Sequence, residues 1–80
     1  MSHWICYLLE CADGTLYCGI TNDLEKRLAA HNAGEGAKYT RSRTPVVVRY
    51  QEKCADKSAA LKREIEIKRL SRAEKLALRS

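Results

Sequence analysis

Short runs of apolar residues, separated by polar ones, occupy the N-terminal part of the chain. Residues 4–10 are mostly aromatic or aliphatic, and residues 15–20 are mostly apolar once Cys18 is included. Between the two runs, Asp13 and Gly14 provide the turn chemistry that joins antiparallel strands. The pattern predicts a β-hairpin, closed by a two-residue turn that pairs Ala12 with Thr15 or by a three-residue turn.

The spacing of apolar and polar residues changes from strand-like to helical after the hairpin. Four residues recur three or four positions apart: Leu24, Arg27, Leu28 and His31. The side chains of residues 21–23 can cap a helix, and Gly34 suits its C-terminal end. These features predict a helix over residues 23–33.

A third strand is predicted over residues 46–52, because a β-branched run begins after Pro45. It runs in the same direction as the second strand, so it would be antiparallel if it lay beside the first. A second helix is predicted over residues 57–70, and the capping box of Ser71 and Glu74 starts a third. We therefore expect an α+β fold with element order β-β-α-β-α-α and a mainly antiparallel three-stranded sheet of order 2-1-3, flanked by helices.

Composition places this pattern in one ordered domain, residues 1–80, with 45% hydrophobic and 31% charged residues. No apolar run reaches the roughly 18 residues of a membrane span, and the N-terminus lacks the pattern of a signal peptide. We expect a soluble, cytoplasmic protein, a monomer without membrane association. The four cysteines form no CxxC pair and are expected to be reduced and to act as small hydrophobic residues.

The charge distribution favours a nucleic-acid partner. The formal net charge is +5, and residues 57–80 hold eight basic and three acidic residues. Residues 36–51 contain four basic residues and no acidic one: Lys38, Arg41, Arg43 and Arg49. Such patches attract phosphate backbones, although proteins that bind no nucleic acid can also carry them.

One carboxylate interrupts the apolar side of the second predicted helix. At helical spacing, four residues define an apolar arc: Ala60, Leu61, Ile65 and Ile67. Glu64 falls within that arc. It is either a partly buried residue paired with Lys68 or with an arginine elsewhere, or a ligand for a hard divalent ion such as Mg²⁺.

Four further residues have both structural and catalytic interpretations. Arg27 and His31 share one helical face, either as ordinary surface and helix-end residues or as a phosphate-stabilising cation and a proton acceptor. Tyr7 and Tyr17 are either amphipathic sheet residues or the source of a general base. Nearby positive charge would favour the phenolate form.

Taken in order, these motifs resemble those of the GIY-YIG nuclease domain. The matching pieces are Ile5-Cys6-Tyr7, Tyr17-Cys18-Gly19 with Ile20-Thr21, Leu24 with Arg27 and His31, and Glu64 after Ala60-Leu61-Lys62-Arg63. The segment from Ala30 to Gly34 and the run Lys38-Tyr39-Thr40-Arg41 are similar to small stand-alone bacterial members. Ile5, Cys6 and Cys18 depart from the motif residues Gly, Ile and Ile that name the family.

The resemblance implies hydrolysis of phosphodiester bonds with one Mg²⁺ or Mn²⁺ ion held by Glu64. By the same resemblance, Tyr7 would activate water, with Tyr17 orienting or assisting it, although the sequence leaves open which tyrosine is the base. Arg27 would stabilise the phosphate and His31 would aid proton transfer. Gly19 would leave room where the strand meets the site.

The expected substrate is single-stranded, branched or otherwise non-duplex DNA, with RNA as an alternative. The residues expected to bind it are Lys38, Tyr39, Arg41, Arg43 and Lys68, with Tyr39 stacking on an unpaired base. Two other functions compete with the nuclease: a nucleic-acid binding module that cleaves little or nothing, and a protein-interaction domain.

Overall fold

The computed structural model describes residues 3–78 and begins with the predicted hairpin. Strand β1 (Trp4–Glu10) pairs antiparallel with β2 (Leu16–Thr21), and Glu10 lies opposite Leu16. The amide of Cys11 donates to the carbonyl of Thr15 at 2.8 Å, and Gly14 has a φ of 83°. The loop is therefore longer than a two-residue turn, and Ala12 is not paired with Thr15 in the strand ladder.

The sheet has the predicted order, β2-β1-β3, with β3 (Val47–Cys54) antiparallel to β1. The register between β1 and β3 shifts between Leu8 and Leu9. The strand order makes β2 an edge strand, which pairs with β1 alone within residues 3–78. This edge carries Tyr17 and Gly19.

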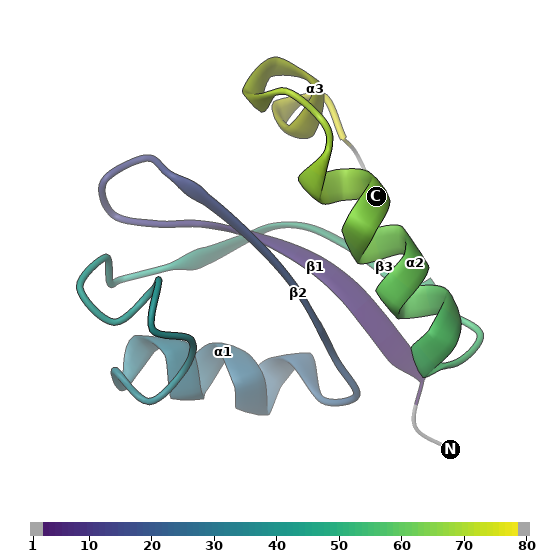
Figure 1. Cartoon of the computed structure of the whole chain (residues 1–80). Coiled ribbons are helices and arrows are strands. Elements are labelled where there is room, and N and C mark those ends of the chain that lie inside the picture. The colour runs from purple at the N-terminus through teal and green to yellow at the C-terminus, as the bar shows by residue number, and fades with distance from the viewer. Residues whose placement is uncertain (1–2, 79–80) are drawn as a thin grey trace.

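Three helices complete the predicted α+β order: α1 (Leu24–Asn32), α2 (Lys57–Lys68) and α3 (Arg72–Leu76). Asp23 caps α1, Asp56 caps α2, and Ser71 with Glu74 forms the predicted capping box of α3. Helices α1 and α2 lie on opposite sides of the sheet (Figure 1). Over residues 3–78, each helix is too short or too polar to cross a bilayer.

The alternation of side chains along β1 gives each sheet face its own apolar cluster. On the α2 side, Cys6 and Leu8 pack with Ile67. On the α1 side, Tyr7 and Leu9 pack with Leu24 and other residues. All four cysteines are free thiols. Tyr7 therefore belongs to the face covered by α1.

The apolar arc predicted for α2 is only partly correct. Ala60 and Ile67 are fully buried, whereas Leu61 is 42% exposed and Ile65 is 51% exposed. Residues three or four positions apart share one face of a helix. Ala60, Glu64 and Ile67 therefore lie on one face, and this face packs on the sheet. Leu61 and Ile65 lie to one side of this face and are exposed to solvent.

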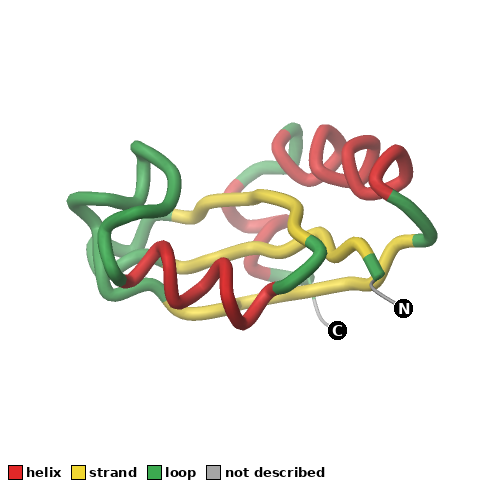
Figure 2. The backbone as a smooth tube through the Cα atoms, turned by 90° about the horizontal axis from the view of Figure 1, so that it is seen from below, coloured by secondary structure: helices red, strands yellow, loops and turns green. Residues whose placement is uncertain are grey.

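The hairpin loop and the long connection over residues 33–46 lie at the same end of the sheet (Figure 2). A backbone hydrogen bond joins them, from the amide of Ala12 to the carbonyl of Arg43 at 2.8 Å. Arg43 also donates from Nε to Asp13 at 3.0 Å. These contacts hold an irregular segment against the sheet next to Tyr17 and His31.

Candidate active site

A buried hydrogen bond between Tyr7 and His31 forms the centre of the site. The Tyr7 hydroxyl lies 3.1 Å from Nε2 of His31, and both residues are almost fully covered, with 1% and 0% exposure. Strand β1 supplies the tyrosine, and the last turn of α1 supplies the histidine. A polar pair inside the cluster of apolar residues has to be satisfied internally, and this contact satisfies both groups.

The other ring nitrogen of His31 contacts Thr40, a residue that was not among the predicted site residues. Nδ1 lies 2.7 Å from the Thr40 Oγ1. The same hydroxyl lies 2.9 Å from the carbonyl oxygen of Ala37. Thr40 is fully buried, so it extends the polar contact from β1 through α1 into the loop over residues 33–46.

Tyr17 borders the same imidazole from the edge strand. Its ring centroid lies 5.5 Å from that of His31, with the planes at 61°. Tyr17 also stacks with Tyr39, and their ring centroids lie 5.9 Å apart. The Arg43 guanidinium lies 4.1 Å from the centroid of the Tyr39 ring. Tyr17 is half-buried, in contrast to the enclosed Tyr7.

Two glycines permit the close packing around the Tyr7–His31 pair. A Cβ atom on Gly19 would lie 2.6 Å from the Tyr7 hydroxyl and 3.3 Å from Cε2 of Tyr17. A Cβ atom on Gly36 would overlap the ring of His31. The expected role of Gly19, to leave room beside the tyrosines, agrees with this geometry. No sequence motif marks Gly36 as part of the site.

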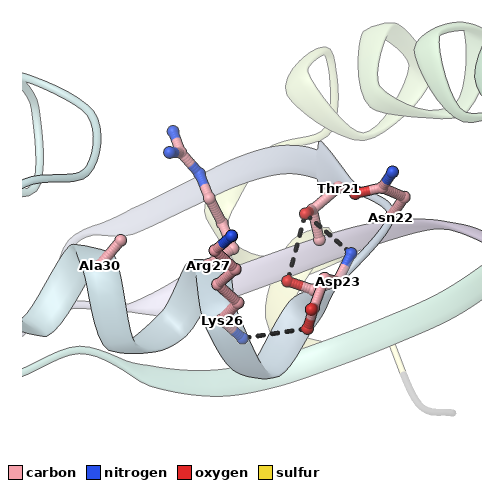
Figure 3. Close-up of a pocket in the computed structure, with 6 residues that line it drawn as sticks. All are labelled: Thr21, Asn22, Asp23, Lys26, Arg27 and Ala30. Carbon is pink, nitrogen blue, oxygen red and sulfur yellow. Dashed lines mark hydrogen bonds between the residues drawn. The ribbon is translucent and has the colours of Figure 1, made fainter.

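Arg27 extends from α1 past β2 and lines a pocket of about 250 Å³ (Figure 3). The pocket also includes Thr21, Asn22, Asp23, Lys26 and Ala30. The hydroxyl of Thr21 accepts from the amide of Asp23, and Asp23 accepts from the amide of Lys26, which fixes the start of α1. Arg27 is thus presented beside β2 by a helix whose first turn is capped (Figure 3).

Burial and the charge of Arg27 set the protonation states of the central pair. Burial, and then the Arg27 guanidinium, lower the pKa of His31. Burial raises the pKa of Tyr7 above its ordinary value; Arg27 opposes this shift, and Tyr17 adds to it. At neutral pH the structure therefore holds a neutral imidazole beside a neutral phenol.

Glu64 lies on α2, on the other side of the sheet from the Tyr7–His31 pair. Its side chain is 18% exposed, and one carboxylate oxygen lies 3.7 Å from Nζ of Lys68. The pKa of the Cys6 thiol is raised by its contact with Cys18 and by burial, and the Glu64 carboxylate adds to this shift, consistent with a position over these cysteines. Among the hydrogen bonds and ion pairs of residues 3–78, none joins Glu64 to Tyr7, Tyr17, Arg27 or His31.

The donors present are compatible with a hard cation only if the substrate completes its coordination. Within the described part of the chain, no three His, Cys, Asp or Glu side chains converge. Mg²⁺ often takes one or two carboxylates and fills its other positions with water and phosphate oxygens. A partly exposed Glu64 fits this type of binding, and the ion would compete with Lys68 for the carboxylate.

The residues expected to bind nucleic acid divide between two regions. Lys38, Tyr39, Arg41 and Arg43 belong to the loop over residues 33–46, whereas Lys68 lies on α2 beside Glu64. Lys38 and Arg41 are exposed. Tyr39 is 40% exposed and contacts Tyr17 and Arg43, so these two partners would compete with a base for its ring.

Residues 3–77 match the model of the GIY-YIG catalytic domain. The chain belongs to the GIY-YIG family. A UPF0213 protein of Halobacterium salinarum is 58% identical to this GIY-YIG domain over 72 residues, covering 90% of this chain and 94% of that protein. The solution NMR structure of an E. faecalis protein shares 44% identity and a TM-score of 0.62, covering 95% and 80% of the two chains. The solution NMR structure of a Bacillus halodurans UPF0213 protein shares 43% identity and a TM-score of 0.55, covering 94% of this chain and 79% of that chain.

Proposed function

We propose that this GIY-YIG domain is a divalent-metal-dependent endonuclease that hydrolyses phosphodiester bonds in single-stranded, branched or otherwise non-duplex DNA. The observation that carries the proposal is the hydrogen bond between Tyr7 and His31. It couples a phenol to a neutral imidazole, with the Arg27 charge close enough to influence both groups. The GIY-YIG match supports a nuclease.

In the proposed mechanism, proton transfer runs from water to Tyr7 and from Tyr7 to His31. The raised pKa of Tyr7 makes a free phenolate scarce, so the phenol gives its proton to Nε2 of His31 while it takes one from water. Water would approach from the β2 edge, where Gly19 has no side chain beside the hydroxyl. The half-buried Tyr17 would orient this water.

Charge stabilisation is assigned to Arg27 and Glu64. Arg27 would contact the phosphate as negative charge develops on its oxygens, because a guanidinium can donate two parallel hydrogen bonds to them. Glu64 would hold one Mg²⁺ or Mn²⁺ ion on the α2 side of the sheet, so a phosphate that contacts both this ion and Arg27 would have to lie across the edge strand β2. When bound, such an ion supplies electrostatic stabilisation of the phosphoryl oxygens.

Binding of the substrate is assigned to the exposed basic residues of the loop over residues 33–46. Lys38 and Arg41 lie close in sequence to Tyr39 and Thr40, which contact Tyr17 and His31. Phosphates held by this loop would therefore be adjacent to the site. The segment is short, which suits a single strand or a branch better than a long duplex.

The ion pair of Glu64 with Lys68 favours a second candidate, a binding module that cleaves little. A carboxylate engaged by a cation in its own helix needs no metal. In this alternative, the basic loop would bind nucleic acid, and the Tyr7–His31 contact would serve only to satisfy buried polar groups.

Cleavage assays on labelled single-stranded, branched and duplex DNA, and on RNA, distinguish the two functions. We expect Mg²⁺ or Mn²⁺ to support cleavage and a chelator to abolish it. Glu64→Gln should be inactive, whereas Glu66→Gln, which removes a carboxylate that is 66% exposed, should cleave like the wild type. Cleavage that persists with a chelator or in Glu64→Gln would contradict the metal role. Binding without cleavage under every condition would support the binding module.

A further inference from the structure

Thr40 is a fully buried polar residue whose hydroxyl has two partners. Oγ1 lies 2.7 Å from Nδ1 of His31 and 2.9 Å from the carbonyl oxygen of Ala37. A threonine hydroxyl has one proton to donate, and a carbonyl oxygen can only accept. If both contacts are hydrogen bonds, Thr40 donates to Ala37 and accepts from Nδ1.

This count of protons also determines the state of the other nitrogen of His31. A neutral imidazole carries one N–H. If that N–H is on Nδ1, Nε2 has a free lone pair, which faces the Tyr7 hydroxyl at 3.1 Å. The contact between Tyr7 and His31 is then a hydrogen bond in which Tyr7 donates.

The opposite arrangement would reverse the Tyr7 contact and leave the Ala37 contact without a proton. If Thr40 donated to Nδ1, two oxygens would face each other at 2.9 Å with no hydrogen between them. The imidazole N–H would then be on Nε2 and point at the Tyr7 oxygen. In that state His31 could not accept the tyrosine proton.

We propose that Thr40 is a positioning residue that holds His31 in the Nδ1–H tautomer and so leaves Nε2 to accept the proton of Tyr7. The catalytic consequence rests on the proposed nuclease function, whereas the tautomer is a property of the free protein. Thr40 acts through His31, and nothing in the proposal requires it to contact substrate.

The surroundings of Thr40 are suited to such a role because they fix its position. The amide of Thr40 donates to Ala37 at 3.0 Å, and its carbonyl accepts from the amide of Arg43 at 3.0 Å. Arg43 is itself joined to the hairpin loop through Asp13 and Ala12. Gly36 allows the preceding turn to lie against the imidazole. Backbone hydrogen bonds to Ala37 and to Arg43 thus fix the main chain of Thr40, and with it the position of the hydroxyl.

Nitrogen NMR of the histidine rings tests the tautomer directly. We would record long-range proton–nitrogen correlations on ¹⁵N-labelled protein near neutral pH, without DNA. His3→Gln assigns the signals, because the chain has two histidines. We expect a pyrrole-type Nδ1 and a pyridine-type Nε2 for His31 in the wild type and in Thr40→Ser. Thr40→Val, which keeps the shape and removes the hydroxyl, should lose this pattern. Thr15→Val, a matched change in the hairpin loop, should keep it.

A wild-type spectrum with a protonated Nε2 would overturn the proposal, as would a Thr40→Val spectrum identical to that of the wild type. If Thr40→Val does not fold, the wild-type and Thr40→Ser spectra still decide it. With a cleavable substrate, Thr40→Val should lower kcat about tenfold or more with little change in KM, since a positioned proton acceptor contributes roughly 10²–10⁴-fold. Thr40→Ser should restore most of this loss. Absence of cleavage in the wild type would count against the nuclease and leave the tautomer test intact.

Discussion

The Tyr7 hydroxyl lies 3.1 Å from Nε2 of His31, and the two side chains are buried together between β1 and α1. Strand β1 also contributes Leu8 to the opposite apolar cluster, so adjacent residues have different tasks. This relationship makes the fold and the proposed chemistry depend on the same strand.

Replacement of Tyr7 by Phe removes the hydroxyl and little else. We expect cleavage to fall by about 10²–10⁴-fold, the usual contribution of a positioned acid or base. The free energy of unfolding should fall by about 1–3 kcal/mol, because Nε2 of the buried His31 loses its hydrogen-bond partner. Rates on labelled DNA and denaturant unfolding check these two values. Tyr50→Phe, which removes the hydroxyl that donates to Glu52, should lose stability alone. Comparable cleavage in both variants would contradict the role of Tyr7.

The stability of the protein should decrease as the pH falls below about 6.5, because the pKa of His31 is lowered from that ordinary value by burial and Arg27. Between the folded and unfolded pKa values, the unfolded chain binds more protons at His31, so protonation favours unfolding. Above about pH 6.5, His31 is neutral in both states, so its contribution to the free energy of unfolding is fully present. Denaturant unfolding from about pH 5 to 8 measures the change. His3→Gln should keep it and His31→Gln should remove it. An equal slope in His31→Gln would refute this explanation.

A methyl group at position 19 should disturb the site directly. In Gly19→Ala the new Cβ would meet the Tyr7 hydroxyl at 2.6 Å, so the ring must move. We expect a loss of about 1–3 kcal/mol of stability and of most cleavage activity. Gly34→Ala provides the control, because its φ of 79° disfavours a side chain while nothing lies within 4 Å of the added atom. It should lose roughly 1–2 kcal/mol and keep its activity. Full activity in Gly19→Ala would disprove the predicted displacement.

Removal of the Arg27 charge should have two separable effects. Arg27→Met should slow cleavage, because the guanidinium would no longer stabilise the phosphate. It should also raise the pKa of His31, because the Arg27 charge contributes to lowering that pKa. The acidic limb of the pH profile of cleavage should therefore move to higher pH. Lys53→Met, which removes a positive charge from β3, should change neither property. A slower variant with an unmoved pH limb would leave Arg27 with the phosphate role alone.

Binding of single-stranded DNA should depend on salt through the loop over residues 33–46. Lys38→Gln and Arg41→Gln should each reduce the slope of log K against log salt by about 0.7, the value for one phosphate contact on a single strand. Fluorescence anisotropy at several salt concentrations measures the slope. Lys53→Gln controls for net charge. An unchanged slope in both loop variants would place the binding surface elsewhere.

The elements and the sheet order could be predicted from the sequence because local periodicity, turn residues and caps specify them. The hairpin, the cap of α1 by Asp23 and the capping box of Ser71 and Glu74 all depend on neighbours in the chain. The exposed side of α2 could not be predicted as reliably. Periodicity places Leu61 and Ile65 on the same side of the helix as Ala60. Packing on the sheet determines that Ala60 is buried while Leu61 and Ile65 are exposed.

The candidate site was predicted in part for a similar reason. Arg27 and His31 are recognisable by their spacing on one helix, and Gly19 by its motif. Thr40 and Gly36 lie in an irregular loop, where no period marks a functional position. Their contacts with His31 arise from tertiary folding. A threonine in a polar, basic segment gives no sign in the sequence that it will be fully buried.

The loop over residues 33–46 gives Tyr39, Thr40 and Arg43 to the surroundings of the site, although it contains no helix or strand. Segments of this kind open locally at a lower energetic cost than the strands of a sheet. Detachment of the loop would free the imidazole from its hydroxyl partner while the three strands stay paired. The proposed cleavage activity should therefore be separable from global stability, and amide exchange in the loop over residues 33–46 is the quantity that should follow that activity.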